Sequence, residues 1–326
     1  MRRPLLAAAA LAAVVAALVP PRSATAQEYP AKPIKLVVTL SPGSTSDILA
    51  RTVGDRMGRG LGQPIVVENR PGLGGNIAGE QVVKAPADGY TIMLATISSH
   101  GINPSLFAKM PYDAVRDFAP IALLASSPNA VIVGPDLPVK NIADLVDYIR
   151  ARPGQITYSS AGIGTSHHLG AELLGSMIGV RMTHVPFKGS PEAVTAVQTG
   201  QVTFMVPNIP NALGLARAGK LKMLAVTTPR RLSWLTDVPT VAESGLAGYE
   251  VIAWFGLVAP AAVPAPVIQR LSAEAGRVLA DPAVRQALQN QGFEVMGGTP
   301  AEFGQFMRAE IDKWAKVVKA SGAKVE

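Results

Sequence analysis

Residues 34–51 read IKLVVTLSPGSTSDILAR, and this stretch decides the fold. A run of strand-forming residues at 34–40 stops at a loop of Ser, Pro, Gly and Thr, and apolar residues at helical spacing follow from Asp47 onward. Such a loop leaves backbone N–H groups and hydroxyls at the positive end of a helix dipole. The stretch therefore predicts a strand–loop–helix unit that can bind an anion.

The same alternation of strand-like and helix-like segments continues along the chain and predicts an α/β fold with largely parallel sheets. The expected strands are residues 34–40, 65–68, 91–95, 121–125, 130–134, 155–160, 182–186, 202–206, 222–227 and 250–258. The expected helices are residues 47–59, 77–84, 142–151, 166–178 and 190–199. We expect Asn141 and Ser190 to cap the helices that follow them. The strand at 250–258 is expected to cross back to the first part of the chain.

The end of the chain predicts one more helix. Thr299-Pro300-Ala301-Glu302 is a capping box with proline at the first helical position. Beyond it, apolar residues recur at helical spacing: Phe303, Phe306, Met307, Ile311, Trp314 and Val318. Such a stripe could face a partner or a membrane, but we expect it to pack against the protein's own core.

The first 26 residues read as a secretory signal rather than as part of the fold. Arg2 and Arg3 precede an apolar run at 5–19, and residues 24–26 have the small-x-small pattern of a signal-peptidase site. A retained anchor is the less favoured alternative, because the apolar run is short for a membrane span. We expect the mature protein to begin at Gln27 and to be exported and soluble; the resemblance described below implies the periplasm.

Composition narrows the class of protein. The remaining length of about 300 residues predicts about two domains. The chain has no Cys, so neither a disulfide nor a lipid anchor is available, and stability must come from large cores. The formal charge of +7 falls to +4 without Arg2, Arg3 and Arg22 (7 − 3 = 4). With 5% aromatic residues and no run of Lys and Arg, nucleic-acid binding is not expected.

Four strand-to-helix loops are chemically alike, and each contains residues with a hydroxyl group. They are residues 41–47, 96–100, 161–166 and 187–191. In an open α/β sheet such loops lie at the carboxyl ends of strands, where these folds bind ligands. If two domains face each other, loops from both converge on one cleft. Lys188, the basic residue in one of these loops, is either a counter-ion or a solvated lysine.

Motifs for chemistry are missing or incomplete. The glycines at 72, 74, 75 and 79 do not follow G-x-G-x-x-G, and no phosphate-binding P-loop occurs. Residues 158–162, YSSAG, lack the first glycine of a hydrolase elbow around Ser160. His167 and His168 are adjacent and would diverge on a helix, which disfavours a metal site, and we expect His168 to pack or hydrogen-bond beside the loop. No catalytic residue, metal or cofactor is predicted.

The order of motifs strongly resembles the extracytoplasmic solute receptors of tripartite tricarboxylate transporters, the TctC/Bug family of periplasmic binding proteins. The motifs span the chain beyond the signal. They are SPGSTSDILAR (41–51), ENRPGLGGN (68–76), DGYTIMLAT (88–96), INPSLF (102–107), SSAGIGTSHHLGAELL (159–174), HVPFKG (184–189), LAVTTPRRLSWLTDVPTVAESG (224–245) and WFGLVAPAAVP (254–264).

The resemblance implies a two-domain Venus-flytrap fold, similar to type II periplasmic binding proteins, with a carboxylate bound between the domains. Residues 27–127 and 254–326 would form domain one, and residues 128–253 domain two. The site residues that the resemblance and the loops suggest are Ser41, Gly43, Ser44, Thr45, Ser46, Asp47 and Ser98 from domain one, and Ser160, Gly162, Gly164, Thr165, Ser166 and Pro207 from domain two. Asp47 is expected to orient its loop, because a carboxylate would repel the ligand.

Two departures from the family pattern bear on the ligand. Ser44 stands where the family often has a second glycine after Pro42-Gly43, and it brings a side chain near the carboxylate site. Pro207 stands where an acidic residue is frequent, so a partner for a ligand amino group is lost. We therefore expect a plain carboxylic acid rather than an amino acid.

The sequence predicts a receptor, not an enzyme, that captures a small di- or tricarboxylic or aromatic acid and delivers it to membrane transporter subunits. It is expected to be monomeric. Three alternatives stay open at this point. They are a sensor component without a role in transport, a secreted hydrolase that uses Ser160, and a receptor for inorganic phosphate or sulfate.

Overall fold

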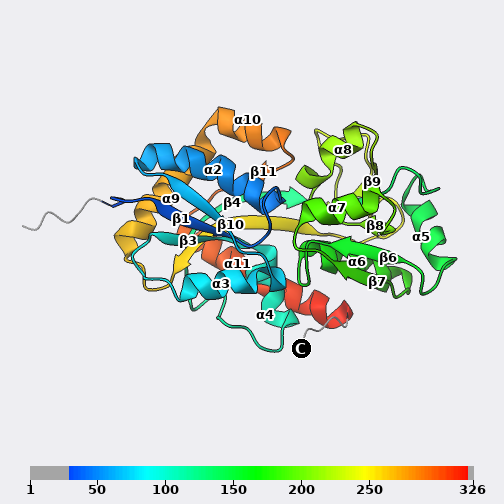
Figure 1. The fold of residues 1–326 in the computed structure, drawn as a ribbon, viewed down its shortest axis with the longest axis horizontal. Helices are drawn as coiled ribbons and strands as arrows, with labels where there is room; N and C mark the ends of the chain where they lie inside the picture. The colour runs from blue at the N-terminus through cyan, green and yellow to red at the C-terminus, as the bar shows by residue number, and fades with distance from the viewer. Residues whose placement is uncertain (1–28, 322–326) are drawn as a thin grey trace, which may run out of the picture. The chain divides into compact units, whose positions relative to one another are not determined.

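The computed structural model describes residues 29–321, so the predicted signal at 1–26 lies outside the described residues. None of the helices in this described part is both long and apolar enough to cross a membrane. Residues from Lys32 onward form one compact unit, and Figure 1 shows its fold. Two sheets with helices around them confirm the predicted α/β class. The prediction of largely parallel sheets is wrong, because each sheet combines parallel with antiparallel strand pairs.

The first sheet has six strands in the order β11-β4-β10-β3-β1-β2. Its strands are β1 (Ile34–Val38), β2 (Ile65–Asn69), β3 (Thr91–Thr96), β4 (Phe118–Pro128), β10 (Ile252–Pro260) and β11 (Glu294–Val295). β1 pairs in parallel with β2 and β3, whereas β10 runs antiparallel to β3 and β4. The helices associated with this sheet are α2 (Thr45–Leu61), α3 (Asn76–Val83), α4 (Asn103–Leu106), α9 (Ala265–Ala280), α10 (Pro282–Asn290) and α11 (Pro300–Ser321). We call this sheet and its helices the first lobe.

The second sheet has five strands in the order β7-β6-β8-β5-β9. Its strands are β5 (Ala130–Val133), β6 (Thr157–Ser160), β7 (Thr183–Pro186), β8 (Phe204–Met205) and β9 (Lys222–Val226). β6 is parallel to both its neighbours, and β5 is antiparallel to β8 and β9. The helices α5 (Ile142–Arg150), α6 (Ser166–Ile178), α7 (Ser190–Gln198) and α8 (Leu213–Arg217) accompany it. We call this sheet and its helices the second lobe.

Two long strands carry the chain between the lobes. β4 leads through Asn129 straight into β5, and the chain returns in β10, whose Ile252 pairs with Pro128. Thr227 joins the two chain segments at the crossing by hydrogen bonds. Its Oγ1 accepts from the Asn129 N–H at 3.0 Å and lies 2.9 Å from the Asn129 carbonyl. The predicted crossing strand at 250–258 is confirmed with a shift of two residues. The predicted domain boundaries lie at this crossing and stay a prediction.

Most predicted elements are present, with several differences. α2 begins at Thr45 rather than Asp47, and the strand predicted at 202–206 is reduced to Phe204–Met205. The predicted cap at Ser190 is wrong, because Gly189 is the N-cap of α7 and Ser190 lies inside the helix. α9 and α10 were not predicted; they meet at Asp281, whose side chain caps α10.

The C-terminal helix α11 packs on the first lobe, as predicted. The capping box is formed, since the Glu302 carboxylate accepts from the Thr299 N–H at 2.7 Å. Phe303, Met307, Trp314 and Val318 of the apolar stripe are buried, and α11 contacts β4 and α4. The ring of Phe303 comes so close to β10 that a β-carbon on Gly256 would lie 2.2 Å from its Cζ.

This contact yields a stability prediction. Gly256→Ala should lower the free energy of unfolding by about 1–3 kcal/mol, because the buried Phe303 ring has no room to retreat. Gly276→Ala is the matched control: nothing lies within 4 Å of its added β-carbon, and alanine in an exposed helix interior should stabilise by about 1 kcal/mol. Urea unfolding of both variants measures the two changes, and equal midpoints would contradict the packing argument.

Candidate functional site

The loop between β1 and α2 is built from buried polar residues. Ser44 is the N-cap of α2, and its Oγ accepts from the Asp47 N–H at 3.4 Å and lies 3.1 Å from Ser46 Oγ. Residues Ser44 to Asp47 are at most 3% exposed, so their buried polar groups need partners. Ser44 therefore serves as a helix cap in this structure, and its hydroxyl is engaged within the loop.

Asp47 holds this loop in shape. Its carboxylate accepts from the Gly43 N–H at 2.9 Å, from Arg51 at 2.9–3.0 Å and from Asn69 Nδ2 at 3.0 Å. Burial by itself would raise the pKa of Asp47, but hydrogen bonds from Arg51, Gly43 and Asn69 outweigh it and hold that pKa below its usual value. Asp47 thus orients the loop, as predicted, and its charge is balanced by Arg51.

The loop between β6 and α6 repeats this design in the second lobe. Thr165 is the N-cap of α6, accepts from the His168 N–H at 3.4 Å and donates to the Gly162 carbonyl at 2.7 Å. Gly162 and Gly164 have φ of +123° and +80°, which favours glycine over residues with a side chain. The Gly164 N–H donates to His168 Nδ1 at 3.3 Å, so His168 lies beside the loop as predicted.

Ser160 ends β6 and contacts a histidine that the sequence did not single out. Its Oγ lies 2.6 Å from His184 Nε2 on the neighbouring strand β7, and it also accepts from the Gly162 N–H at 3.1 Å. The His184 ring stacks against both Tyr158 and His168, with ring centroids 4.9 Å and 4.2 Å away. Within the described residues, no carboxylate bonds to the His184 ring. The contact fixes the loop and also supplies the serine–histidine geometry that a hydrolase would need.

His167 ties the loop to the crossing between the lobes. Its Nδ1 accepts from the Ala161 N–H at 3.3 Å, and its Nε2 lies 2.9 Å from Asn208 Oδ1. Asn208 Nδ2 donates in turn to Asn129 Oδ1 at 3.0 Å. The neighbouring Pro207 is buried, and its carbonyl accepts from the Ala130 N–H. Pro207 thus lies in the segment that supports the loop.

The loops of the two lobes touch at four close approaches. A β-carbon on Gly189 would lie 1.7 Å from Ser41 Oγ, and one on Gly43 would lie 3.5 Å from Pro191. A β-carbon on Gly164 would lie 2.4 Å from Asn103 Oδ1. The fourth approach is at Gly74, where a β-carbon would lie 2.8 Å from the Ile163 carbonyl. At Gly74 the neighbour is backbone, so a side chain there would push the lobes apart; at Gly189 and Gly164 a side chain would displace Ser41 or Asn103.

A hydrogen-bonded contact joins the same loops. Asn211 follows β8 in the second lobe, and its Oδ1 accepts from both the backbone N–H (3.0 Å) and the hydroxyl of Thr45. Its Nδ2 donates to the Gly43 carbonyl at 2.9 Å. Sequence reasoning missed Asn211, Asn103 and His184, since nothing local to these residues indicates a partner.

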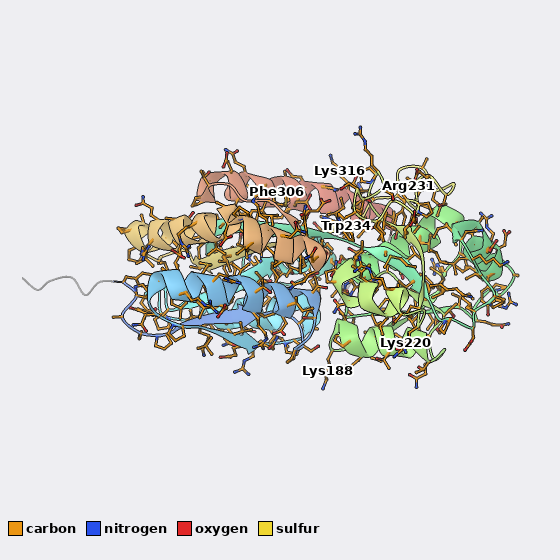
Figure 2. All side chains as sticks on the ribbon, turned by 90° about the horizontal axis from the view of Figure 1, so that it is seen from above. Lys188, Lys220, Arg231, Trp234, Phe306 and Lys316 are labelled. Carbon is orange, nitrogen blue, oxygen red and sulfur yellow. The ribbon has the colours of Figure 1, made fainter. Side chains whose placement is uncertain are left out.

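The other predicted site residues are placed less centrally. Ser166 Oγ is 3.4 Å from Asn129 Nδ2, so this hydroxyl faces the crossing. Ser98 is buried in the short π-helix η2 (Ser98–Ile102), apart from the contacts described above. Lys188 is exposed and projects away from the protein (Figure 2), which fits a solvated lysine.

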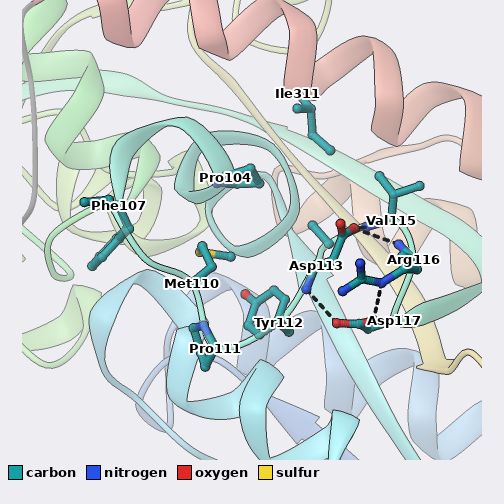
Figure 3. Close-up of a pocket in the computed structure, with 12 residues that line it drawn as sticks. Pro104, Phe107, Met110, Pro111, Tyr112, Asp113, Val115, Arg116, Asp117 and Ile311 are labelled. Carbon is teal, nitrogen blue, oxygen red and sulfur yellow. Dashed lines mark hydrogen bonds and ion pairs between the residues drawn. The ribbon is translucent and has the colours of Figure 1, made fainter.

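A surface pocket of about 650 Å³ lies elsewhere in the first lobe (Figure 3). Phe107, Met110 and Ile311 supply apolar walls, and none of the predicted site residues lines it. Its cation, Arg116, is paired with Asp117 at 3.1 Å. The pocket is therefore a weaker candidate for an anion-binding site than the two loops are.

Burial keeps the four histidines uncharged. It lowers the pKa of His100 and of His168 to about 3, and the pKa of His167 and of His184 to about 4. At neutral pH none of these rings supplies a positive charge. An anion at the loops would therefore be held by backbone N–H groups, hydroxyls and helix dipoles.

These shifts predict a pH dependence of stability. A histidine in the unfolded chain takes up a proton near pH 6.5, whereas the folded rings stay neutral to about pH 4. The unfolded state binds more protons, so the free energy of unfolding should fall as pH is lowered from about 6.5 to about 4. Denaturant titrations across this range measure the fall, and His184→Gln should reduce its slope. Imidazole NMR signals that move between pH 8 and pH 5.5 would contradict the neutral rings.

The chain is similar to known proteins in both sequence and structure. Residues 49–323 match the family described as "Tripartite tricarboxylate transporter family receptor". BugT of Bordetella pertussis is 33% identical over 303 residues, which covers 93% of each chain. The solved structure of R. palustris Rpa4515 with adipate has a TM-score of 0.89 and 37% identity, covering 91% of this chain and 100% of that one.

A second solved structure agrees with this similarity. MatC (Rpa3494) from Rhodopseudomonas palustris, with bound malate, has a TM-score of 0.85 and 33% identity, covering 89% of this chain and 100% of that one. The resemblance inferred from the motifs is thereby confirmed. This chain belongs to the family of tripartite tricarboxylate transporter receptors.

Proposed function

We propose that the protein is a periplasmic receptor that binds a small di- or tricarboxylic or aromatic acid between its two lobes and delivers it to a tripartite tricarboxylate-type membrane transporter. The observation that carries the proposal is the meeting of the β1–α2 and β6–α6 loops, where two helices begin and the lobes touch at Gly164 and Gly189. Family membership supports the receptor role, and the relatives solved with adipate and malate support the ligand class.

The electrostatics of the loops suit a carboxylate. Helix N-termini attract negative charge, each by about 0.3–1 kcal/mol when exposed and more when enclosed. Charge-assisted hydrogen bonds add about 1.5–3 kcal/mol each. Asp47 would repel an anion, but Arg51 balances its charge, and hydrogen bonds from Gly43 and Asn69 anchor its carboxylate. We propose Ser41, Ser46, Thr165 and the backbone of Gly162 and Gly164 as the groups closest to the ligand.

The ligand class is tested by thermal shift. Di- and tricarboxylates, aromatic acids, amino acids and inorganic anions are each added at saturating concentration. A ligand that binds only the folded protein raises its melting temperature, and we expect the largest rise with a carboxylic acid that has no amino group. A response only to phosphate or sulfate would replace the carboxylate proposal with an inorganic anion.

The inter-lobe site is tested by a pair of glycine variants that flank α6. Gly164→Ala should weaken binding of the responding acid about tenfold or more, because its methyl group would strike Asn103 and hold the lobes apart. Gly179→Ala is the control: its φ of +72° carries a similar backbone strain, but nothing lies within 4 Å. Isothermal titration of both variants gives the affinities, and equal loss in both would argue against a site between the lobes.

Because Ser160 contacts His184, the alternative of a secreted hydrolase needs its own test. A secreted hydrolase would turn over an ester or amide, and Ser160→Ala would abolish that turnover. A receptor would show binding without turnover. A role in sensing rather than transport is separated by deletion of the gene, which would abolish uptake in the first case and only a response in the second.

A further inference from the structure

The amide of Asn211 occupies the start of α2 in the way that a ligand would. Its Oδ1 accepts both the backbone N–H and the hydroxyl of Thr45, and its Nδ2 donates to the Gly43 carbonyl. Thr45 is the first residue of α2, so this backbone N–H is one of those left free by the helix. Three hydrogen bonds from one side chain in the second lobe therefore end on one loop of the first lobe.

The segment that carries Asn211 is held firmly in the second lobe. It is the short 3₁₀ helix η3 (Ile209–Asn211), closed by a bond from the Ala212 N–H to the Ile209 carbonyl at 2.9 Å. Ile209 is fully buried in the core of that lobe. Gly292 of the first lobe abuts the same segment, since a β-carbon there would lie 3.2 Å from Ile209. The Asn211 amide is thus presented in a defined position.

An amide suits this position better than a carboxylate. It can accept from Thr45 on one side and donate to the Gly43 carbonyl on the other, whereas both oxygens of an aspartate can only accept. An amide is also neutral, so it adds no repulsion toward a carboxylate bound nearby. Because Asn211 uses the donors of Thr45, a ligand would be left with other groups of the two loops.

We propose that Asn211 is a closure latch, a positioning residue that joins the lobes through the start of α2 whether or not a ligand is bound. The inference rests on the proposed function for its effect on affinity, and it adds the means by which closure is controlled. By favouring the closed arrangement in advance, the latch raises affinity and slows release of the ligand.

The latch is tested first without any ligand. The chain has no Cys, so Arg56→Cys and Lys220→Cys, both at exposed positions in different lobes, give a pair of spin labels that attach only there. With Asn211 intact we expect a short, narrow distance distribution, and Asn211→Ala should make it longer and broader. Asn141→Ala is the matched control, because Asn141 only caps α5 within the second lobe. Identical distributions with and without Asn211→Ala would overturn the latch.

The effect on binding is measured with adipate and malate as probes. Asn211→Ala should weaken the affinity about tenfold or more, mostly through faster dissociation, since three hydrogen bonds of the closed state are lost. Asn211→Asp should weaken it further, in a manner relieved by salt, because a charge is added beside the ligand. Unchanged dissociation in Asn211→Ala would also overturn the latch. If neither acid binds the unmodified protein, adipate and malate are excluded as ligands, while the distance measurement still decides the latch.

Discussion

The antiparallel pairing of β4 with β10 is the constraint on which the rest of the structure depends. This ladder extends from Phe118 opposite Pro260 to Pro128 opposite Ile252, and both strands lead directly into the second lobe. Asn129 and Thr227 join the two passages of the chain by hydrogen bonds at the crossing. Asn208 contacts both His167 and Asn129, so the crossing and the loop of the second lobe belong to one hydrogen-bonded network.

Hydrogen bonds to side chains hold the two buried loops in shape. Asp47 anchors the first loop, and Thr165, Ser160 and His167 anchor the second. These bonds satisfy polar groups whose burial without a partner would be unfavourable. A rigid set of N–H groups and hydroxyls reduces the ordering cost of binding. Neutral histidines around the loop keep this arrangement constant across physiological pH.

Closure uses two kinds of contact with different roles. Gly74, Gly164 and Gly189 allow the backbones of the two lobes to approach, since each lacks the side chain that would collide. Asn211 adds directional hydrogen bonds between the lobes, because its amide pairs with both a donor and an acceptor of the opposite loop. The glycines permit the closed arrangement and the amide favours it. Ligand binding in such a design adds to an equilibrium that the protein already biases.

The sequence by itself determined the α/β class, most strands and helices, and the two loops that begin α2 and α6. Helix α6 spans the predicted residues, because its cap and apolar spacing act within a few residues of each other. Only the tertiary structure decided what those loops contact. Asn211 meets Thr45 across 166 positions of sequence, and Ser160 meets His184 because β6 lies beside β7. Strand order and the crossing between lobes create these contacts, and no local pattern encodes them.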